Sequence, residues 1–474
     1  MNTRTTSLSF RAATATALVA AVSGVLAGGA GRPPPPPPPA PPPPPGPAPG
    51  PPPPPPGRGG GGGGGGRPAP GGGGGGAPPP PPPARSAAST PASSSTVDTD
   101  RAAPGASLTT GRLQRAVERT LRDAGYVNVS VDVRHGSRHT TARAGEAELN
   151  TGRPVPAGAS FRAASVTKSF VSTVVLQLVA EGRVSLDDSV DHWLPGLITG
   201  NGNDGRRITV RNLLQHTSGL YNYDRTEDTG ETAADFERTR FERVEPAELI
   251  AGSLRHRPDF EPADPDDPNP KWNYSNPGYV LLGMIIKKAT GHDWATEVER
   301  RISKPLGLRG TYAPGADPFL HGPHAHTYQQ FPGSTGMTDT TVRSMSWADA
   351  AGALVTTERD LDRFYTALVT GRLLPEKQFA EMRRTVPVGA DFDEVMPGLQ
   401  YGLGLMRQPL PCGGYRWGHG GDTDGGTIRT GFTSDGKHGV VIVASGKASS
   451  DEWLLKSERA VQRLTDEALC GTQD

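Results

Sequence analysis

Runs of proline and glycine near the N-terminus limit where this chain can fold. Proline is uninterrupted over residues 33–39, 41–45 and 51–56, and glycine over 59–66 and 71–76. Because proline has no N–H donor, its runs cannot join helices or sheet ladders and form polyproline II instead, while glycine runs are flexible. We therefore expect residues 31–106 to be a disordered linker. Its composition fits both a spacer that holds the rest of the chain away from a surface and a stretch without a selected role.

The segment before this linker has the pattern of a secretory signal peptide. Arg4 and Arg11 supply positive charge, residues 12–26 are mostly apolar, and small residues suited to cleavage follow. The apolar stretch is short for a membrane span, so we expect residues 1–30 to be removed, leaving a protein that is secreted or associated with the cell wall. The remainder, residues 107–474, is long enough for one functional unit made of two closely packed subdomains.

Charge and cysteine content exclude several classes of partner. The chain has 49 Lys and Arg residues against 49 Asp and Glu residues, which gives no electrostatic case for nucleic acid or anionic lipid. Its two cysteines, Cys412 and Cys470, suggest one disulfide in an exported chain, joining the strand region before His419 to the last helix. Neither cysteine has a ligand partner at zinc spacing, so we expect no metal site. We also expect no other cofactor and a monomeric protein.

Helix and strand patterns at the two ends of the folded part mirror each other. Residues 113–124 have apolar positions at helical spacing, and 127–147 alternates like two strands around a turn. Two strand patterns over 427–444 and a helical pattern over 452–469 repeat this in reverse, while residues 165–385 are mostly helical with long loops. This order predicts an α+β fold, in which an antiparallel β-sheet flanked by N- and C-terminal helices is interrupted by a mostly helical domain. Functional sites commonly lie at such a junction.

The pattern Ser165-Val166-Thr167-Lys168 is the sharpest chemical signal. Apolar residues at helical spacing follow it, and positions three apart lie on one face of a helix, so the Lys168 amine can reach the Ser165 hydroxyl. A serine hydroxyl needs a base to become nucleophilic, and a lysine can serve when burial or nearby positive charge destabilises its ammonium form. Taken alone, the pattern is more often an N-capping serine and a surface lysine.

Two further patterns support a nucleophilic site. Tyr274-Ser275-Asn276 precedes an apolar helix; a tyrosine oxygen can pass a proton beside a lysine, and an amide can bind both the amine and a substrate carbonyl. Residues 417–421, with His419 at their centre, open the C-terminal strands, where small residues let a substrate lie along the strand edge and backbone N–H groups can stabilise an oxyanion. Separately, these patterns also fit a turn before a helix and a glycine-rich hairpin with a structural histidine. Their order and spacing together leave little room for coincidence.

SVTKSF, YSN and HGG resemble the three motifs of the serine β-lactamase and penicillin-binding superfamily. The resemblance is greatest to secreted actinomycete D-alanyl-D-alanine carboxypeptidases and class C-like serine hydrolases, and it covers almost all of the folded region. It implies a β-lactamase/transpeptidase-like fold and an exported serine hydrolase that forms an acyl-enzyme on peptidoglycan-type D-amino-acid peptides and β-lactams. Alternatives within the same resemblance are a β-lactamase, an esterase, and a penicillin-binding or penicillin-sensing protein that does not turn over.

The resemblance also implies roles for individual residues. Ser165 would be the acylated nucleophile, Lys168 the base that activates it, and Tyr274 the group that returns the proton to the leaving amine. The substrate-positioning residues would be Asn276, His419, Gly421 and Trp347. A buried tryptophan that holds the helical domain is the alternative for Trp347, and His216 in the stretch HTSGL is expected to be structural.

Two features depart from the carboxypeptidase pattern. In those relatives an arginine directly after YGLGL, and hydroxyls one and three positions after the motif histidine, hold the terminal carboxylate of the substrate. Here these positions are Met406, Gly420 and Asp422. Arg407 is one residue away, and adjacent side chains of a strand face opposite sides. We therefore predict weak discrimination between a free terminal carboxylate and its amide or ester.

Overall fold

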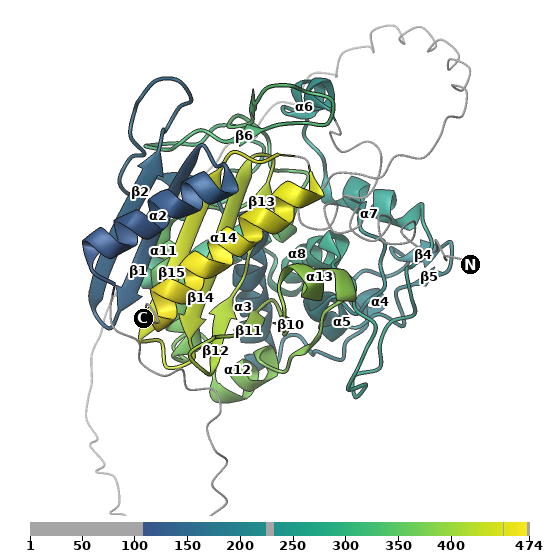
Figure 1. The fold of residues 1–474 in the computed structure, drawn as a ribbon. Helices are drawn as coiled ribbons and strands as arrows, with labels where there is room; N and C mark the ends of the chain where they lie inside the picture. The colour runs from purple at the N-terminus through teal and green to yellow at the C-terminus, as the bar shows by residue number, and fades with distance from the viewer. Residues whose placement is uncertain (1–107, 224–231, 449, 472–474) are drawn as a thin grey trace, which may run out of the picture. The chain divides into compact units, whose positions relative to one another are not determined.

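The computed structural model describes residues 108–223, 232–448 and 450–471. The predicted signal peptide over residues 1–30 and the predicted linker over 31–106 lie outside the described residues. Figure 1 shows the described part as an antiparallel sheet, with two long helices across one face and a mostly helical region beside it.

Nine strands form the main sheet of the described residues, in the order β2-β1-β15-β14-β12-β11-β10-β9, with β13 also paired to β14. The strand β1 pairs with β15 along its whole length, so that Val131 lies opposite Ile442. The mirrored sequence patterns predicted that both ends supply strands to the sheet, and the structure pairs these two ends directly. The strands are β1 (Asn128–His135), β2 (Arg138–Gly145), β9 (Val386–Pro387), β10 (Gln400–Tyr401), β11 (Met406–Pro409), β12 (Tyr415–Gly418), β13 (Gly421–Thr423), β14 (Gly426–Thr433) and β15 (His438–Ser445).

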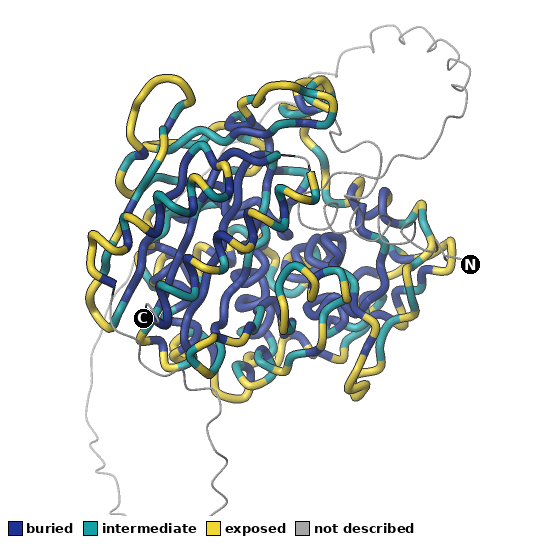
Figure 2. The backbone as a smooth tube through the Cα atoms, viewed as in Figure 1, coloured by how far each residue is buried: buried dark blue, intermediate teal, exposed yellow. Residues whose placement is uncertain are grey.

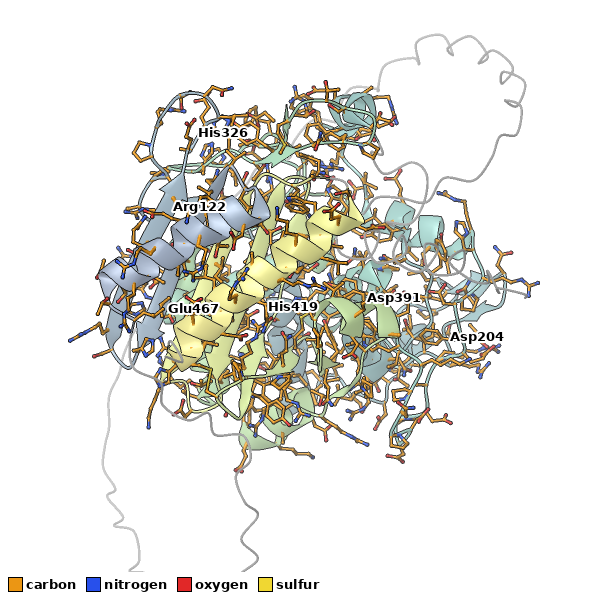
Figure 3. The ribbon with its side chains drawn as sticks, in the orientation of Figure 1. Arg122, Asp204, His326, Asp391, His419 and Glu467 are labelled. Atoms are coloured by element: carbon orange, nitrogen blue, oxygen red, sulfur yellow. A yellow bond between two sulfur atoms is a disulfide. The ribbon has the colours of Figure 1, made fainter. Side chains whose placement is uncertain are left out.

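Two helices, α2 (Thr110–Ala124) and α14 (Asp451–Cys470), cross the same face of this sheet side by side (Figure 1). The first ends at Gly125, whose φ of 70° is the left-handed conformation that glycine adopts without a steric penalty. An ion pair between Arg119 and Glu467 joins the two helices (Glu467 is labelled in Figure 3). Cys470, the last residue of α14, forms a disulfide with Cys412, which confirms the predicted bond.

The other face of the sheet packs on the helical region. At its centre lies α3 (Thr167–Ala180), whose residues from Thr167 to Leu176 are all buried, and Figure 2 shows this interior in dark blue. Three small two-stranded sheets lie outside the main sheet. They pair β3 (Ser160–Arg162) with β8 (Val355–Thr357), β4 (Thr199–Gly200) with β5 (Asn203–Asp204), and β6 (Tyr328–Gln329) with β7 (Thr338–Asp339). The remaining helices are α4 (Val190–Trp193), α5 (Val210–Gln215), α6 (Ala233–Thr239), α7 (Pro246–Leu254), α8 (Asn276–Thr290), α9 (Trp294–Val298), α10 (Lys304–Leu306), α11 (Glu358–Val369), α12 (Glu376–Met382) and α13 (Ala390–Val395), with shorter turns η1 (Ala164–Val166), η3 (Glu299–Ser303) and η4 (Asp349–Ala351).

The predicted α+β fold is confirmed. The main hydrophobic core lies between the sheet and the helical region, while a second core lies beneath α2 and α14. The chain passes from sheet to helical region through β3, η1 and α3, so Ser165 lies at the junction of the two parts.

Candidate active site

Ser165 lies in a short, constrained turn between β3 and α3. The preceding residue, Ala164, has a φ of 47°, a left-handed conformation that costs free energy for a residue with a Cβ atom. Contacts with the chain before β8 hold the turn: Ala163 donates its backbone N–H to the Leu354 carbonyl at 2.7 Å, and the Leu354 N–H donates to Thr167 Oγ1 at 3.1 Å. The strained turn places Ser165 just before α3, among the residues that line a cavity.

Lys168 is fully buried one turn further along the helix. Its Nζ donates to Ser165 Oγ at 3.0 Å, to Asn276 Oδ1 at 2.7 Å and to the Ala351 carbonyl at 2.7 Å. All three acceptors are neutral oxygens, so no carboxylate among these contacts holds the ammonium form. The structure thus brings together the lysine, the serine and the asparagine that the motifs predicted.

Tyr274 lies against the same lysine. Lys168 Nζ is 4.7 Å from the centroid of the Tyr274 ring, and the ring is nearly parallel to that of Phe392 at 5.9 Å. Tyr274 is buried and lines the cavity together with Ser165. Asn276 begins α8, and its backbone N–H donates to Asn222 Oδ1 at 3.2 Å, which fixes the first turn of that helix beside Lys168.

The HGG motif forms a break between β12 and β13. The Thr430 side chain inserts there, accepting from the His419 N–H and donating to the His419 carbonyl, both at 2.9 Å. Gly421 lies so close to the serine turn that a Cβ atom there would be 2.5 Å from the Ala163 carbonyl oxygen and 3.1 Å from the Ser165 nitrogen. Glycine at this position therefore lets the strand edge approach the nucleophile, where backbone N–H groups can meet a developing oxyanion.

An ordered chain of hydrogen bonds connects the YSN motif to the HGG motif. The Ser275 N–H can only donate, so His216 Nδ1 accepts it at 3.2 Å and His216 Nε2 carries the proton, which it donates to Tyr401 Oη at 3.1 Å. At the other end the Gly420 carbonyl can only accept, so His419 Nδ1 donates to it at 2.6 Å. His419 Nε2 then accepts from Tyr401 Oη at 2.9 Å. The proton positions worked out from the two ends of this hydrogen-bond chain agree at Tyr401, which accepts from His216 and donates to His419.

Burial keeps both histidines neutral. Desolvation, followed by the positive charge of Lys168, lowers the pKa of His419 to about 3 and lowers the pKa of His216 well below its usual value. Desolvation also raises the pKa of Tyr401 well above its ordinary value. The chain therefore orients the two motifs by fixed hydrogen bonds and does not change charge near neutral pH. Of the two histidines, His419, labelled in Figure 3, is the one that lines the cavity.

The cavity beside Ser165 is lined by apolar, polar and charged residues. Met406 lines it, whereas Arg407 is turned away, with its guanidinium 4.3 Å from the centroid of the Tyr415 ring. Trp347 does not line this cavity: it is half-buried beside the Arg343 guanidinium and packs on the main core. The lining residues are Ser165, Tyr274, Phe392, Met396, Leu399, Met406, Gln408, Arg416, Gly418, His419, Gly420, Gly421, Asp422, Arg429 and Thr430.

Asp422 is neutralised by two buried cations. Arg429 Nη1 lies 2.9 Å and Lys447 Nζ 3.4 Å from its carboxylate, and Arg429 also pairs with Glu458 of α14. Burial alone would raise the pKa of Asp422, but the charges of Arg429 and Lys447 hold it below its usual value. Asp422 therefore lines the cavity as a paired carboxylate.

Three participants in the site carried no sequence signal of their own. The Ala351 carbonyl acts through the backbone, which any residue type supplies. Tyr401 belongs to YGLGL, but its role between two histidines requires that the chain segments meet. Arg416 directly precedes the pattern over residues 417–421, but that pattern gives it no role, and the strand register is what places it among the cavity-lining residues.

The described part of the chain contains no group of three or more His, Cys, Asp or Glu side chains placed to hold a metal ion. It also contains no helix that is both long and apolar enough to cross a membrane.

Known proteins resemble this chain over most of the described residues. The family model described as Beta-lactamase matches residues 113–463. Penicillin-binding protein 4* of Bacillus subtilis (strain 168) is 27% identical over 342 residues, which are 69% of this chain and 68% of that protein.

Solved structures give the same result. A D-stereospecific amidohydrolase from Streptomyces sp. superposes with a TM-score of 0.67 and 37% identity, covering 77% of this chain and all of that one. The D-amino acid amidase from Ochrobactrum anthropi SV3, in complex with L-phenylalanine amide, has a TM-score of 0.64 and 28% identity, covering 76% of this chain and 99% of that one. With the Ser165–Lys168 pair in place and a family model matching well over half of its length, the chain belongs to the β-lactamase family of serine hydrolases.

Proposed function

We propose that this protein hydrolyses peptide or amide bonds on the carboxyl side of a D-amino acid, through an acyl-enzyme on Ser165. The observation that carries the proposal is the position of Lys168 Nζ, 3.0 Å from Ser165 Oγ and 2.7 Å from Asn276 Oδ1. A base at hydrogen-bond distance from a serine hydroxyl is the arrangement that nucleophilic acyl transfer requires.

The proposed reaction has two halves. Ser165 Oγ bonds to the substrate carbonyl carbon while Lys168 takes the hydroxyl proton, and backbone N–H groups near Ser165 and Gly421 stabilise the oxyanion. The carbonyl–nitrogen bond then breaks, and the amine leaves with a proton delivered through Tyr274. In the second half a water molecule loses a proton to the same base and attacks the ester carbon. The acid is released and Ser165 regains its proton.

The finer proposal is a D-alanyl-D-alanine carboxypeptidase-like activity on cell-wall peptides, outside the cell. It is supported by the three motifs, by the similarity to a penicillin-binding protein, and by the disulfide, which is typical of exported proteins. A second candidate is the hydrolysis of D-amino-acid amides. The similarity to two D-amino-acid-specific amide hydrolases favours it, and so does Met406 where carboxypeptidases have an arginine.

A panel of substrates tests the proposal. Purified protein is given acetyl-D-Ala-D-Ala, a D-amino-acid amide, nitrocefin and a p-nitrophenyl ester, and each D substrate is compared with its L counterpart. We expect steady release of amine from the D compounds and a mass adduct with penicillin on Ser165. The matched control, Ser165→Ala, should give neither. A penicillin adduct of undiminished yield in the variant, or equal rates for D and L substrates, would contradict the proposal, while one burst without turnover would indicate a penicillin-binding sensor.

A further inference from the structure

Arg416 is a buried cation that has no carboxylate partner among the described residues. Its side chain is 8% exposed, and it forms no ion pair within the described part of the chain. Its Nη2 donates to two neutral amide oxygens, Gln408 Oε1 and Gln462 Oε1 at 2.6 Å, and its Nε has no partner there. Desolvation lowers the pKa of Arg416 to about 10, which still leaves the guanidinium charged at neutral pH.

The strand register places Arg416 among the residues that line the cavity of Ser165. Met406 pairs with Gly418 and Gln408 with Arg416, so these four residues share one face of the sheet, and all four line the cavity. Arg407 pairs with Trp417, and neither lines it. Arg416 is therefore on the correct face to meet a substrate, whereas Arg407 is not.

Two other buried cations near the cavity have carboxylate partners. Arg429 and Lys447 are matched by Asp422 and Glu458, with ion pairs among all four. The acid with the largest effect on the pKa of Arg416 is Asp466, followed by Glu458. Asp466 accepts a hydrogen bond from Gln462 Nε2, and burial raises its pKa. The guanidinium of Arg416 thus has no carboxylate at ion-pair distance among the described residues, and the acceptors of its hydrogen bonds are neutral amide oxygens. An unpaired buried charge is costly, and an anion that enters the cavity would remove that cost.

We propose that Arg416 binds a carboxylate of the substrate, and that the preferred substrates are D-amino-acid peptides that carry such a carboxylate. This inference rests on the proposed function. Arg416 is five residues before Gly421, which lies against the serine turn, so the strand separates them by at most roughly 17 Å, and the arginine side chain shortens the gap. Because Ser165 and Arg416 line the same cavity, a substrate that acylates Ser165 can extend a carboxylate toward Arg416.

A carboxylate bound by Arg416 gives the site a preference for free acids, whereas the sequence predicts weak discrimination between acids and their amides or esters. Met406 removes the cation from the position where carboxypeptidases have it, but a cation on the next strand, on the same face, supplies the charge instead. A carboxylate held by a guanidinium gains charge-assisted hydrogen bonds, so we expect the free acid to be preferred about 10- to 100-fold in kcat/KM.

Two pairs of substrates locate the carboxylate. The first pair is acetyl-D-Ala-D-Ala and its terminal amide, which differ on the leaving side. The second is succinyl-D-Ala p-nitroanilide and its succinyl methyl ester, which differ on the acyl side. We expect the acid to be preferred in at least one pair. The same acid–neutral difference should appear in binding to Ser165→Ala, measured by calorimetry, which does not depend on turnover.

Three variants test the residue. Arg416→Gln removes the charge. Gln408→Glu keeps the guanidinium but replaces the amide that it already contacts with a carboxylate, which neutralises it. Both should bring the acid–neutral ratio close to one. The matched control is Arg407→Gln, which removes a cation from the opposite face of the adjoining strand and should leave the ratio as it is.

The outcomes separate this inference from the proposed function. Turnover of neutral D substrates without a preference for acids, in catalysis and in binding, would overturn the role of Arg416 and leave the proposed function intact. A preference that survives both Arg416→Gln and Gln408→Glu would overturn it as well. If no D substrate is hydrolysed or bound at all, the proposed function fails and the inference fails with it.

Discussion

Proton positions at His216 and His419 are set by two backbone groups that each have a single hydrogen-bonding role. The Ser275 N–H and the Gly420 carbonyl fix opposite ends of one chain, and Tyr401 closes it in the middle. This arrangement needs both rings neutral, because a second proton on either ring would face another donor. The consequence is measurable as a dependence of stability on pH.

The first prediction concerns His419, whose folded-state pKa of about 3 is below the usual value of 6.5. As pH falls below about 6.5, the unfolded chain binds a proton at this residue that the native protein does not. Stability is therefore fully present above that pH and is lost as pH falls, by about 1.4 kcal/mol per pH unit for this one group. The free energy of unfolding, measured with urea at several pH values between 6 and about 4, is plotted against pH. The slope of this plot should be smaller by this amount in His419→Gln than in the native protein. Identical slopes would mean that the native ring is protonated.

Residues close together along the chain could be assigned to the site from the sequence, whereas residues that meet only in the folded protein could not. Ser165 and Lys168 were predicted as partners because helical spacing fixes their separation, and the structure gives 3.0 Å between the side-chain atoms. The residues Tyr401 and Arg416 act on segments distant along the chain, so their roles depend on tertiary contacts that local patterns do not encode. Trp347 was predicted from resemblance alone, and the structure places it outside the cavity that Ser165 lines.

Among the elements, the helices were predicted best where apolar periodicity and an end signal coincide. The predicted helix over residues 113–124 ends at Gly125, as α2 does. The apolar run over 280–289 lies within α8, which begins earlier, at Asn276, because Pro277 suits the first turn of a helix. The short strands β9 and β10 had no usable period, since two residues are too few to show alternation.

The second prediction concerns the contact between β13 and the serine turn. Gly421→Ala places a Cβ atom 2.5 Å from the Ala163 carbonyl, so the strand edge must move away from Ser165. Because a displacement of about 1 Å can cost about 100-fold in rate, we expect acylation by penicillin to slow by that order while the protein stays folded. Stopped-flow acylation and thermal unfolding measure the two effects.

The matched control for this variant is Gly420→Ala. Its Cβ atom would meet only the Arg429 side chain, at 3.3 Å and beyond. Its loss of acylation rate should be about tenfold smaller than that of Gly421→Ala. Equal losses in the two variants would show that the close approach of Gly421 has no special role.

On the scale of the whole molecule, the disulfide joins the hairpin after β11 to the end of α14 across 58 positions of sequence. The third prediction is that Cys412→Ser with Cys470→Ser lowers the free energy of unfolding by about 4 kcal/mol, which is the loop-closure contribution for a loop of this length. Urea unfolding of the variant should match that of the reduced native chain. A variant as stable as the oxidised protein would show that helix packing alone holds this end.

The pairing of β1 with β15 has a consequence for the order of events during synthesis. The strand that completes the middle of the sheet, residues 438–445, leaves the ribosome more than three hundred residues after its partner at 128–135. Until then β1 has only β2 beside it, and a lone hairpin is marginally stable in water. Contacts between such distant segments also form slowly. The middle of the sheet can therefore close only after residues 438–445 have been made.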